Sequence, residues 1–335
     1  MEREQIITKF KKTIPTFEIE SDKCPICSSN KYSILSNKDR YGFDLTYGCC
    51  VICGLIQSIY KYKLKNYATF YNNFYGLIYK NEIVSKNKNN EINEKSFLSR
   101  KKIGKTIFDY IFDFVTLKPN SKILEIGCGL GGIISYFYDK GYNVKGIDLK
   151  EQDVNFAKSK GLNVEKKTLE NIKKSEKFDF IILMRSLEHI HDPLSFLKLL
   201  RTKLNDGGIL LISVPSLDSL FHTTDIKKMN IQSQLHFAHI YFFSKESLKN
   251  LMSICGFKNI HMNHYINSLW IKSDKTLPSL KGNKKVLFSL FYLKNFKYIT
   301  RYNNLIKMII LYINKNGFIN TFGKIFSIIR KEQKY

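Results

Sequence analysis

Two pairs of cysteines near the start of the chain have the spacing of metal-binding knuckles. Cys24 and Cys27 form one Cys-x-x-Cys pair, and Cys50 and Cys53 form the second. Two such pairs can place four thiolates around one zinc ion, which leaves no open position on the metal and predicts a structural role. Cys49 could stand in for Cys50, although the pair would then have the less usual Cys-x-x-x-Cys spacing.

The cysteine content and the start of the chain bear on where the protein works. Seven cysteines in 335 residues are few and clustered, so the disulfides of an extracellular framework are the less favoured alternative. The opening residues Met-Glu-Arg-Glu-Gln are charged and contain no apolar signal core, and no window holds 18 consecutive apolar residues. We therefore expect a protein of the reducing cytoplasm without a membrane-spanning helix.

A glycine-rich turn after an apolar segment indicates a site for a ribose-bearing ligand. Gly127 and Gly129 would let the backbone approach the ligand, and the following helix would offer free N–H groups. Asp148 ends the next expected strand, where a carboxylate can accept hydrogen bonds from both ribose hydroxyls. With Gly132, the turn also fits the dinucleotide pattern GxGxxG. Glu125 favours a ligand with an ammonium group instead, because its carboxylate would repel a pyrophosphate.

Histidine and glutamate side chains follow two later strands, where they could accept protons. The candidates are Glu188, His189 and His191 after one strand, and His222, His236, His239 and Tyr241 after the next. Ligands of open α/β sheets bind outside the carboxyl ends of the strands. The sequence therefore predicts catalytic roles for His236, His239, Glu188 and His189, with packed or surface positions as the alternative for each.

The elements that must position these groups alternate between strand and helix. Strands are expected at residues 121–126, 142–148, 163–167, 178–184 and 208–214, with a terminal pair within 257–271. Helices are expected at 97–115, 132–140, 151–160, 193–204 and 244–255. Asp192 would cap the fourth of these helices, and Pro193 would occupy its first position. This alternation predicts an α/β fold with a parallel, doubly wound sheet.

Three pieces of the sequence together resemble a known family. They are the run Leu124-Glu-Ile-Gly-Cys-Gly-Leu-Gly, then Asp148, then Phe178-Asp-Phe-Ile-Ile-Leu-Met-Arg-Ser-Leu-Glu-His-Ile-His-Asp-Pro193. In this order they resemble the class I S-adenosylmethionine-dependent methyltransferases. The resemblance implies a Rossmann-like, seven-stranded methyltransferase fold with S-adenosyl-L-methionine as cofactor.

The same resemblance implies a set of cofactor-binding positions. Glu125 would bind the methionine amino group, Asp148 would hold the ribose, and Glu170 would flank the adenine. Arg185 departs from the small or polar residue usual at its position, and could reach an anion on the substrate. The full implied set is Glu125, Gly127, Cys128, Gly129, Asp148, Leu149, Leu169, Glu170, Met184, Arg185 and Ser186. Cys128 and Cys255 are expected to be small buried side chains.

The layout of the chain resembles a narrower group. A knuckle pair, a tyrosine-rich segment and this core are similar to the zinc-containing methyltransferases of sugar and surface-polysaccharide pathways, which include nucleotide-sugar C-methyltransferases. That resemblance implies a small-molecule or sugar acceptor, nucleotide-linked and anionic. Tyr71 and Tyr75 could line the sugar site or belong to an aromatic core. An RNA methyltransferase and a non-catalytic binding or scaffold protein remain the alternatives. The oligomeric state and the accepting atom, carbon, nitrogen or oxygen, stay open.

Charge and composition divide the chain further. The expected parts are a lead-in (1–20), a zinc-ribbon (21–60), an aromatic segment with a polar linker (61–97), the methyltransferase domain (98–272) and a basic helical extension (273–335). Of the formal net charge of +25, residues 275–335 contribute thirteen Lys or Arg and one acid. Such a tail could contact an anionic membrane peripherally at its inner face, or pack on the core or on a second copy. Nucleic acid is disfavoured as a partner because few of the 54 basic residues are Arg.

Overall fold

The computed structural model describes residues 3–21, 23–79, 86–216, 234–263, 265 and 267–274. Its largest element is a seven-stranded sheet in the order β12-β13-β10-β9-β6-β7-β8. The strands are β6 (Lys122–Ile126), β7 (Asn143–Asp148), β8 (Val164–Lys166), β9 (Phe178–Met184), β10 (Leu204–Ser213), β12 (Phe257–Met262) and β13 (Asn267–Lys272). Strand β13 runs antiparallel to both of its neighbours, and the other pairings are parallel. The predicted Rossmann-like, seven-stranded fold is confirmed.

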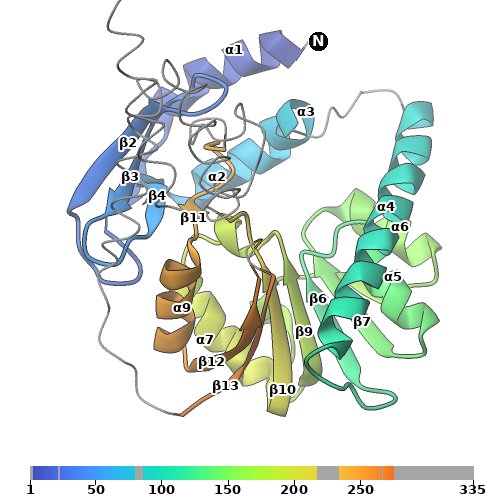
Figure 1. Cartoon of the computed structure of the whole chain (residues 1–335). Helices are drawn as coiled ribbons and strands as arrows, with labels where there is room; N and C mark the ends of the chain where they lie inside the picture. Colours follow the sequence, from blue (N-terminus) through green and yellow to red (C-terminus); the bar gives the residue numbers. More distant parts are fainter. Residues whose placement is uncertain are drawn as a thin grey trace, which may run out of the picture. The chain divides into compact units, whose positions relative to one another are not determined.

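Helices cover the two faces of this sheet (Figure 1). One face carries α4 (Lys86–Phe112), α5 (Gly132–Asp139) and α6 (Glu151–Ser159), and the other carries α7 (Pro193–Lys203) and α9 (Lys245–Ile254). The cap expected at Asp192 is present, because its side chain accepts a hydrogen bond from the Ser195 N–H, and Ser244 forms a capping box with Ser247. Buried apolar side chains of the strands and of α5 fill the space between the layers, among them Ile123, Phe137, Phe180, Ile182 and Leu211.

Two boundaries differ from the sequence prediction by more than three residues. Residues 85–95, expected as a linker, lie within α4 from Lys86 onward. The pair between Glu91 and Lys95, 2.6 Å apart and four residues apart in the chain, stabilises that turn of the helix. Strand β10 begins at Leu204 instead of Gly208, because an irregular register lets it pair with Phe178 before the main ladder resumes.

Residues 3–79, here called the N-terminal module, contain short elements. The helices are α1 (Arg3–Thr13), η1 (Ile14–Thr16), α2 (Leu64–Phe70), η2 (Tyr71–Tyr75) and α3 (Gly76–Tyr79). The strands are β1 (Ile19–Ser21), β2 (Tyr32–Lys38), β3 (Asp44–Cys50), β4 (Ile56–Ser58) and β5 (Lys61–Tyr62). Phe10 of α1 packs against Phe43, Phe70 and Phe74, with ring centroids 4.7 to 5.1 Å apart. The tyrosine-rich segment thus contributes to an aromatic core.

A strand from the methyltransferase part completes the sheet of the N-terminal module. The order of this four-stranded sheet is β11-β4-β3-β2, and β11 (Tyr241–Phe242) follows the histidine-bearing segment (Figure 1). Tyr241 pairs with Gln57, and Phe242 pairs with Ile56. The module is therefore joined through backbone hydrogen bonds to the segment predicted to carry catalytic side chains.

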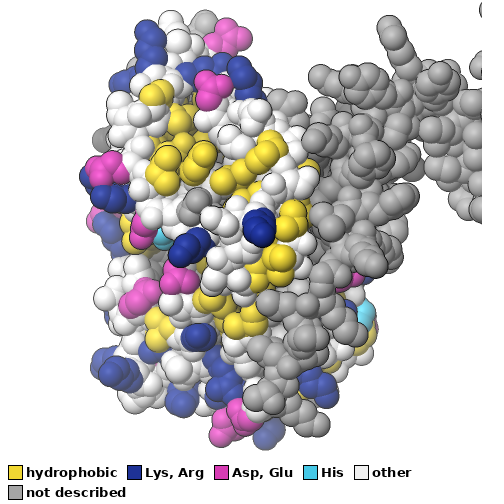
Figure 2. All heavy atoms as spheres, turned by 90° about the vertical axis from the view of Figure 1, so that its left-hand side faces the viewer, with side chains coloured by type: hydrophobic (Ala, Val, Ile, Leu, Met, Phe, Trp, Pro, Cys, Tyr) yellow, Lys and Arg dark blue, Asp and Glu magenta, His cyan; other side chains and the backbone are white. Residues whose placement is uncertain are grey.

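The surface bears both signs of charge. On the face in Figure 2, Lys and Arg side chains are interspersed with Asp and Glu instead of forming one stripe. Within the described ranges, no helix is long and apolar enough to cross a membrane. The basic extension predicted at 273–335 lies, beyond Asp274, outside the described residues.

Candidate functional site

The glycine turn after β6 has the backbone shape that its sequence predicts. Gly127 and Gly129 have φ angles of 73° and 52°, in the left-handed region that favours glycine. A Cβ atom on Gly127 would lie 2.7 Å from the Ser186 Oγ, so a side chain there would push into the residues after β9. Because Gly127 and Gly129 carry no side chains, a ligand at the carboxyl ends of β6 and β9 can approach the backbone at these two residues.

Asp148, at the end of β7, is oriented by two backbone amides. Its Oδ2 accepts a hydrogen bond of 2.8 Å from the Gly129 N–H, and its Oδ1 accepts one of 2.9 Å from the Lys150 N–H. The carboxylate is therefore held beside the glycine turn. Each oxygen keeps a further lone pair for a ligand, and a pair of ribose hydroxyls fits this arrangement.

Glu125 lies two residues before the turn and is 2% exposed. Its Oε2 has no hydrogen-bond partner among the described residues. Burial raises the pKa of Glu125 to about 8, with nearby Arg100 opposing the shift. A buried carboxyl oxygen without a hydrogen-bond partner is costly. A cationic group on a bound ligand would satisfy it, as the amino group of S-adenosylmethionine would.

The other predicted cofactor positions vary in burial. Ser186 donates through Oγ to the carbonyls of Ile126 and Met184, which ties the segment after β9 to β6. Met184 is half-buried and Arg185 is exposed, with a φ of 52°. Leu169 is buried and Glu170 exposed in η3 (Leu169–Asn171), which follows β8, and Leu149 is 66% exposed. Cys128 and Cys255 are buried, as predicted.

The four predicted catalytic residues lie close together. Glu188 and His189 lie in η4 (Leu187–His189), and the Oε1 of Glu188 lies 3.9 Å from the Nε2 of both His189 and His239. The rings of His236 and His239 have centroids 3.6 Å apart. We call Glu188, His189, His236 and His239 the histidine cluster.

Burial dominates the acid–base properties of this cluster. It raises the pKa of Glu188 to about 8 and lowers that of His189 to about 4. The pKa of His236 falls to about 2, and that of His239 falls well below its usual value, also because of burial. At neutral pH the imidazoles are uncharged, which is the form that accepts a proton.

Residues of the N-terminal module that the sequence did not single out hold this cluster in place. Asp39 is 1% exposed; its Oδ1 accepts hydrogen bonds from the N–H groups of Tyr41 and Phe43, and its Oδ2 accepts one from Phe237. The Arg40 N–H donates to the Leu235 carbonyl. The sequence around Asp39 carries only a turn signal, so its partner far along the chain could not have been found there.

The remaining candidates divide between the cluster and its surroundings. The Tyr71 hydroxyl lies 3.0 Å from the Nδ1 of His189, so this tyrosine contacts the cluster. His191 points away, with its Nε2 3.0 Å from the Tyr62 carbonyl and 3.1 Å from Glu20. Tyr241 donates to the His191 carbonyl. His222 lies outside the described residues.

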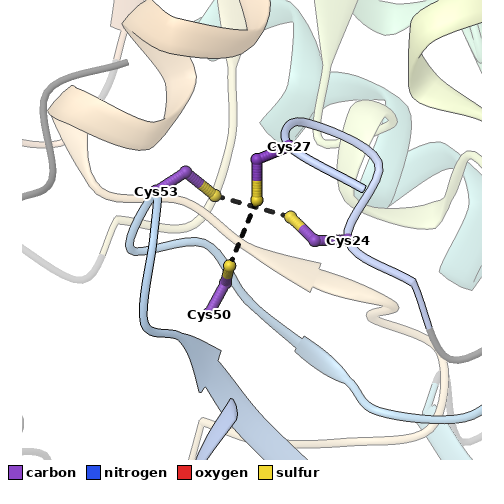
Figure 3. A group of neighbouring side chains, drawn as sticks. All are labelled: Cys24, Cys27, Cys50 and Cys53. Carbon is purple, nitrogen blue, oxygen red and sulfur yellow. Dashed lines mark hydrogen bonds between the residues drawn. The ribbon is translucent and has the colours of Figure 1, made fainter. Parts of the chain in front are cut away.

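The four predicted metal-binding cysteines also meet (Figure 3). The Sγ atoms of Cys24 and Cys53 are 3.4 Å apart, and so are those of Cys27 and Cys50. Sulfurs bound to one zinc at about 2.3 Å lie about 3.8 Å apart, so a small expansion would admit the ion. Cys49 is not a member, because its Sγ contacts the Cys50 carbonyl. Of the two alternatives at this knuckle, Cys50 is the one that faces the other three.

Known proteins resemble the segment that contains this site. A family model described as "Methyltransferase domain" matches residues 99–262. The ubiquinone biosynthesis O-methyltransferase of Actinobacillus pleuropneumoniae serotype 7 is 35% identical over 118 residues, which cover 30% of this chain and 50% of the relative. The protein of the same name from Colwellia psychrerythraea is 36% identical over 104 residues, covering 28% of this chain and 41% of the relative.

Among solved structures, a SAM-dependent methyltransferase from Archaeoglobus fulgidus is 24% identical. The match covers 48% of this chain and 69% of the Archaeoglobus fulgidus chain, with a TM-score of 0.40. The chain spans about half the length of the curated relatives it matches. Residues 99–262 thus match a methyltransferase domain model, and the seven-stranded sheet, which β13 (Asn267–Lys272) completes, has the Rossmann-like methyltransferase fold.

Proposed function

We propose that this protein transfers a methyl group from S-adenosylmethionine to a small-molecule acceptor. The observation that carries the proposal is the buried, unpartnered Oε2 of Glu125 beside the glycine turn and the fixed carboxylate of Asp148. Glu125 would pair with the cofactor's ammonium group, and Asp148 would accept from its ribose. The cofactor supplies a methyl group already activated on a sulfonium. The chain's own task is to hold the acceptor in line and remove a proton where needed.

The histidine cluster is the proposed acceptor side of the site. His189 and His239 are about 15 to 21% exposed at their side chains, and their uncharged rings suit proton removal from an acceptor hydroxyl. The Nδ1 of His236 is buried and has no hydrogen-bond partner among the described residues. The curated relatives are named O-methyltransferases, which supports an oxygen as the accepting atom.

The acceptor we propose is a sugar, nucleotide-linked or part of a surface-polysaccharide precursor. The resemblance of the chain's layout to sugar-pathway enzymes supports this class. Two arginines also support an anionic acceptor, because Arg40 and Arg185 lie near enough to His239 to depress its pKa. RNA remains the alternative, and the scarcity of Arg weighs against it.

The zinc-ribbon has a structural part in this proposal. Four thiolates saturate a zinc ion, so the metal would join the turn before β2, which carries Cys24 and Cys27, to Cys50 at the end of β3 and Cys53 in the turn before β4. Since β4 pairs with β11, the metal would also stabilise the strand that follows the histidine cluster.

Transfer of a labelled methyl group tests the proposal. The full-length protein would be incubated with methyl-labelled S-adenosylmethionine and, separately, nucleotide-sugars, free sugars and structured RNA. We expect label in a nucleotide-sugar fraction, and much less label with the Asp148→Ala variant at a cofactor concentration below saturation. Label found only in RNA would show that the acceptor is RNA and not a nucleotide-sugar. Cofactor binding without transfer to any acceptor would favour a non-catalytic binding protein.

A further inference from the structure

We propose that Glu188, His189 and His239 form a second metal site, which binds one divalent transition-metal ion and is separate from the four cysteines. One ligand atom from each side chain lies within 4.8 Å of the other two. The Oε1 of Glu188 is 3.9 Å from the Nε2 of each histidine. Two ligands of one ion, each bound at about 2.0 to 2.2 Å, lie about 3 to 4 Å apart. The three atoms are thus spaced to share an ion after a small inward movement.

The carboxylate of Glu188 is the strongest reason to place an ion here. Its side chain is 0% exposed, and neither oxygen has a hydrogen-bond partner among the described residues. Buried carboxylates are normally paired, hydrogen-bonded or bound to a metal. The separations of 3.9 Å are too long for hydrogen bonds to the histidines, but they leave room for a cation between the three groups.

The hydrogen bonds of His189 orient it as a ligand. Its Nδ1 lies 2.6 Å from the Ala238 carbonyl, so the Nδ1–H donates there and the lone pair is on Nε2. That Nε2 is the atom near Glu188. A metal-binding imidazole commonly donates its other N–H to a backbone carbonyl, which fixes the tautomer and the ring. The Tyr71 hydroxyl donates to the same carbonyl and packs beside His189.

The backbone holds the two halves of the site together. The Ile240 N–H donates to the Glu188 carbonyl at 2.9 Å, and the His239 N–H donates to the His236 carbonyl at 2.9 Å. Ser58 of β4 donates to the Ile240 carbonyl from the other side. Residues from η4 and from the segment before β11 are therefore fixed against each other. These hydrogen bonds hold Glu188 and His239 in place before a metal binds, although the two residues lie far apart in the sequence.

The two histidine ligands are partly exposed, whereas the carboxylate is not. Glu188 forms the closed base at 0% exposure, whereas the side chains of His189 and His239 are 21% and 15% exposed. Three protein ligands with one open position are typical of catalytic metal sites. Two imidazoles and a carboxylate favour zinc, iron, cobalt, nickel or manganese in the divalent state over magnesium or calcium.

The role of the ion rests on the proposed function, although its binding does not. An acceptor hydroxyl at the open position would be oriented and made more acidic by the ion. As that oxygen forms a bond to the methyl carbon, the carbon–sulfur bond of the sulfonium breaks and its electron pair stays on sulfur. The hydroxyl proton passes to solvent water, and His236, whose ring contacts His239, is not one of the three ligands.

Metal content per chain tests the site directly. The full-length protein, its Cys27→Ser/Cys53→Ser variant, Glu188→Gln and His239→Ala would each be loaded with Zn²⁺, desalted and measured by elemental analysis. We expect Glu188→Gln and His239→Ala each to hold one ion fewer than the unmodified chain. His236→Ala is the matched control from the same buried cluster, and it should keep the full content.

Cobalt substitution separates the two sites by their ligands. Co²⁺ at the cysteines gives intense thiolate-to-metal charge-transfer absorption, whereas Co²⁺ on nitrogen and oxygen gives only weak visible bands. Weak bands that persist in the cysteine variant and vanish in His239→Ala are the expected result. If circular dichroism shows that Glu188→Gln does not fold, the metal content of His239→Ala alone is compared with that of the unmodified chain. Unchanged metal content in every folded variant of these two would disprove the second site. If the second ion is found but S-adenosylmethionine does not bind in calorimetry, the proposed function fails and the metal site stands.

Discussion

The Oδ2 of Asp39 accepts a hydrogen bond of 3.3 Å from the backbone N–H of Phe237, which lies between His236 and His239. A turn of the N-terminal module therefore fixes the backbone of the segment that carries two of the four predicted catalytic side chains. Phe237 itself inserts among the aromatic rings of the module, 4.6 Å from Phe70 and 5.1 Å from Phe10. The module thus forms part of the acceptor side of the proposed site.

Replacing Asp39 should loosen this connection. Asp39→Ala leaves the buried N–H groups of Phe237, Phe43 and Tyr41 without their acceptor, so we expect the free energy of unfolding to fall by about 1 to 3 kcal/mol or more. Urea denaturation of the two proteins measures this. Asp44→Ala is the matched control, because Asp44 is 87% exposed and should change stability by less than about 0.5 kcal/mol. An equal effect of the two substitutions would contradict the role given to Asp39.

The cysteine cluster should bind zinc through four named ligands. In the Cys27→Ser/Cys53→Ser variant we expect loss of the thiolate-bound ion and faster proteolysis of the N-terminal module, since metal binding there is coupled to folding. Elemental analysis and limited proteolysis give the two readouts. Cys49→Ser changes a neighbouring thiol whose sulfur faces a backbone carbonyl, and it should retain the ion. Loss of one ion from Cys49→Ser, or the full metal content of the unmodified chain in the double variant, would reject the ligand set.

Binding of S-adenosylmethionine at pH 7 should release a proton from Glu125. Burial places the pKa of this carboxyl at about 8 in the free protein, so it is mainly protonated at pH 7. A bound ammonium group favours the carboxylate and lowers that pKa. The release should shrink as the pH rises through 8, because the free protein is then already ionised.

Calorimetry in two buffers of different ionisation enthalpy measures this proton release. We expect Glu125→Gln to bind the cofactor more weakly and to lose the release. Glu151→Gln is the control, because Lys166 keeps the pKa of that exposed carboxyl below its usual value and it is ionised throughout. A heat of binding that is the same in both buffers for the unmodified protein would rule out the role of Glu125.

The basic C-terminal extension stays a prediction, because it lies outside the described residues. Its charge and its alternation of Lys with large apolar side chains favour weak, salt-sensitive attraction to anionic lipid. We expect the full chain to co-sediment with anionic liposomes at low salt, and a chain ending at Asp274 to do so less. Equal sedimentation of the two would leave packing on the core or on a second copy as the explanation.

Local patterns account for the part of the fold that could be predicted. The bounds of β9, Phe178–Met184, follow from an apolar run that only a buried parallel strand explains. The start of α7 follows from Asp192 and Pro193. The glycine turn follows from glycines, which adopt its left-handed backbone without strain. The approach of Asp148 to the turn follows from the order of the strands.

Contacts between distant short segments account for what could not be predicted. The pairing of β4 with β11 joins Ile56 to Phe242 through strands of three and two residues, which are too short to show a period. Asp39 likewise meets Phe237 without any local signal in either segment. The histidines could be chosen as candidates by their position after strands, but only the structure shows that the N-terminal module brings them together with Glu188.

The most direct test of the central claim is a calorimetric titration of the purified, full-length protein with S-adenosylmethionine. The account predicts saturable binding of one cofactor per chain. It also predicts that Asp148→Ala weakens this binding at least tenfold, by about 1.5 kcal/mol, through loss of the bonds to the ribose. Asp179→Ala removes a carboxylate at the opposite end of the sheet, where it accepts from the Lys122 N–H, and it should leave the affinity unchanged. Binding of a nicotinamide dinucleotide with no binding of S-adenosylmethionine would contradict the account.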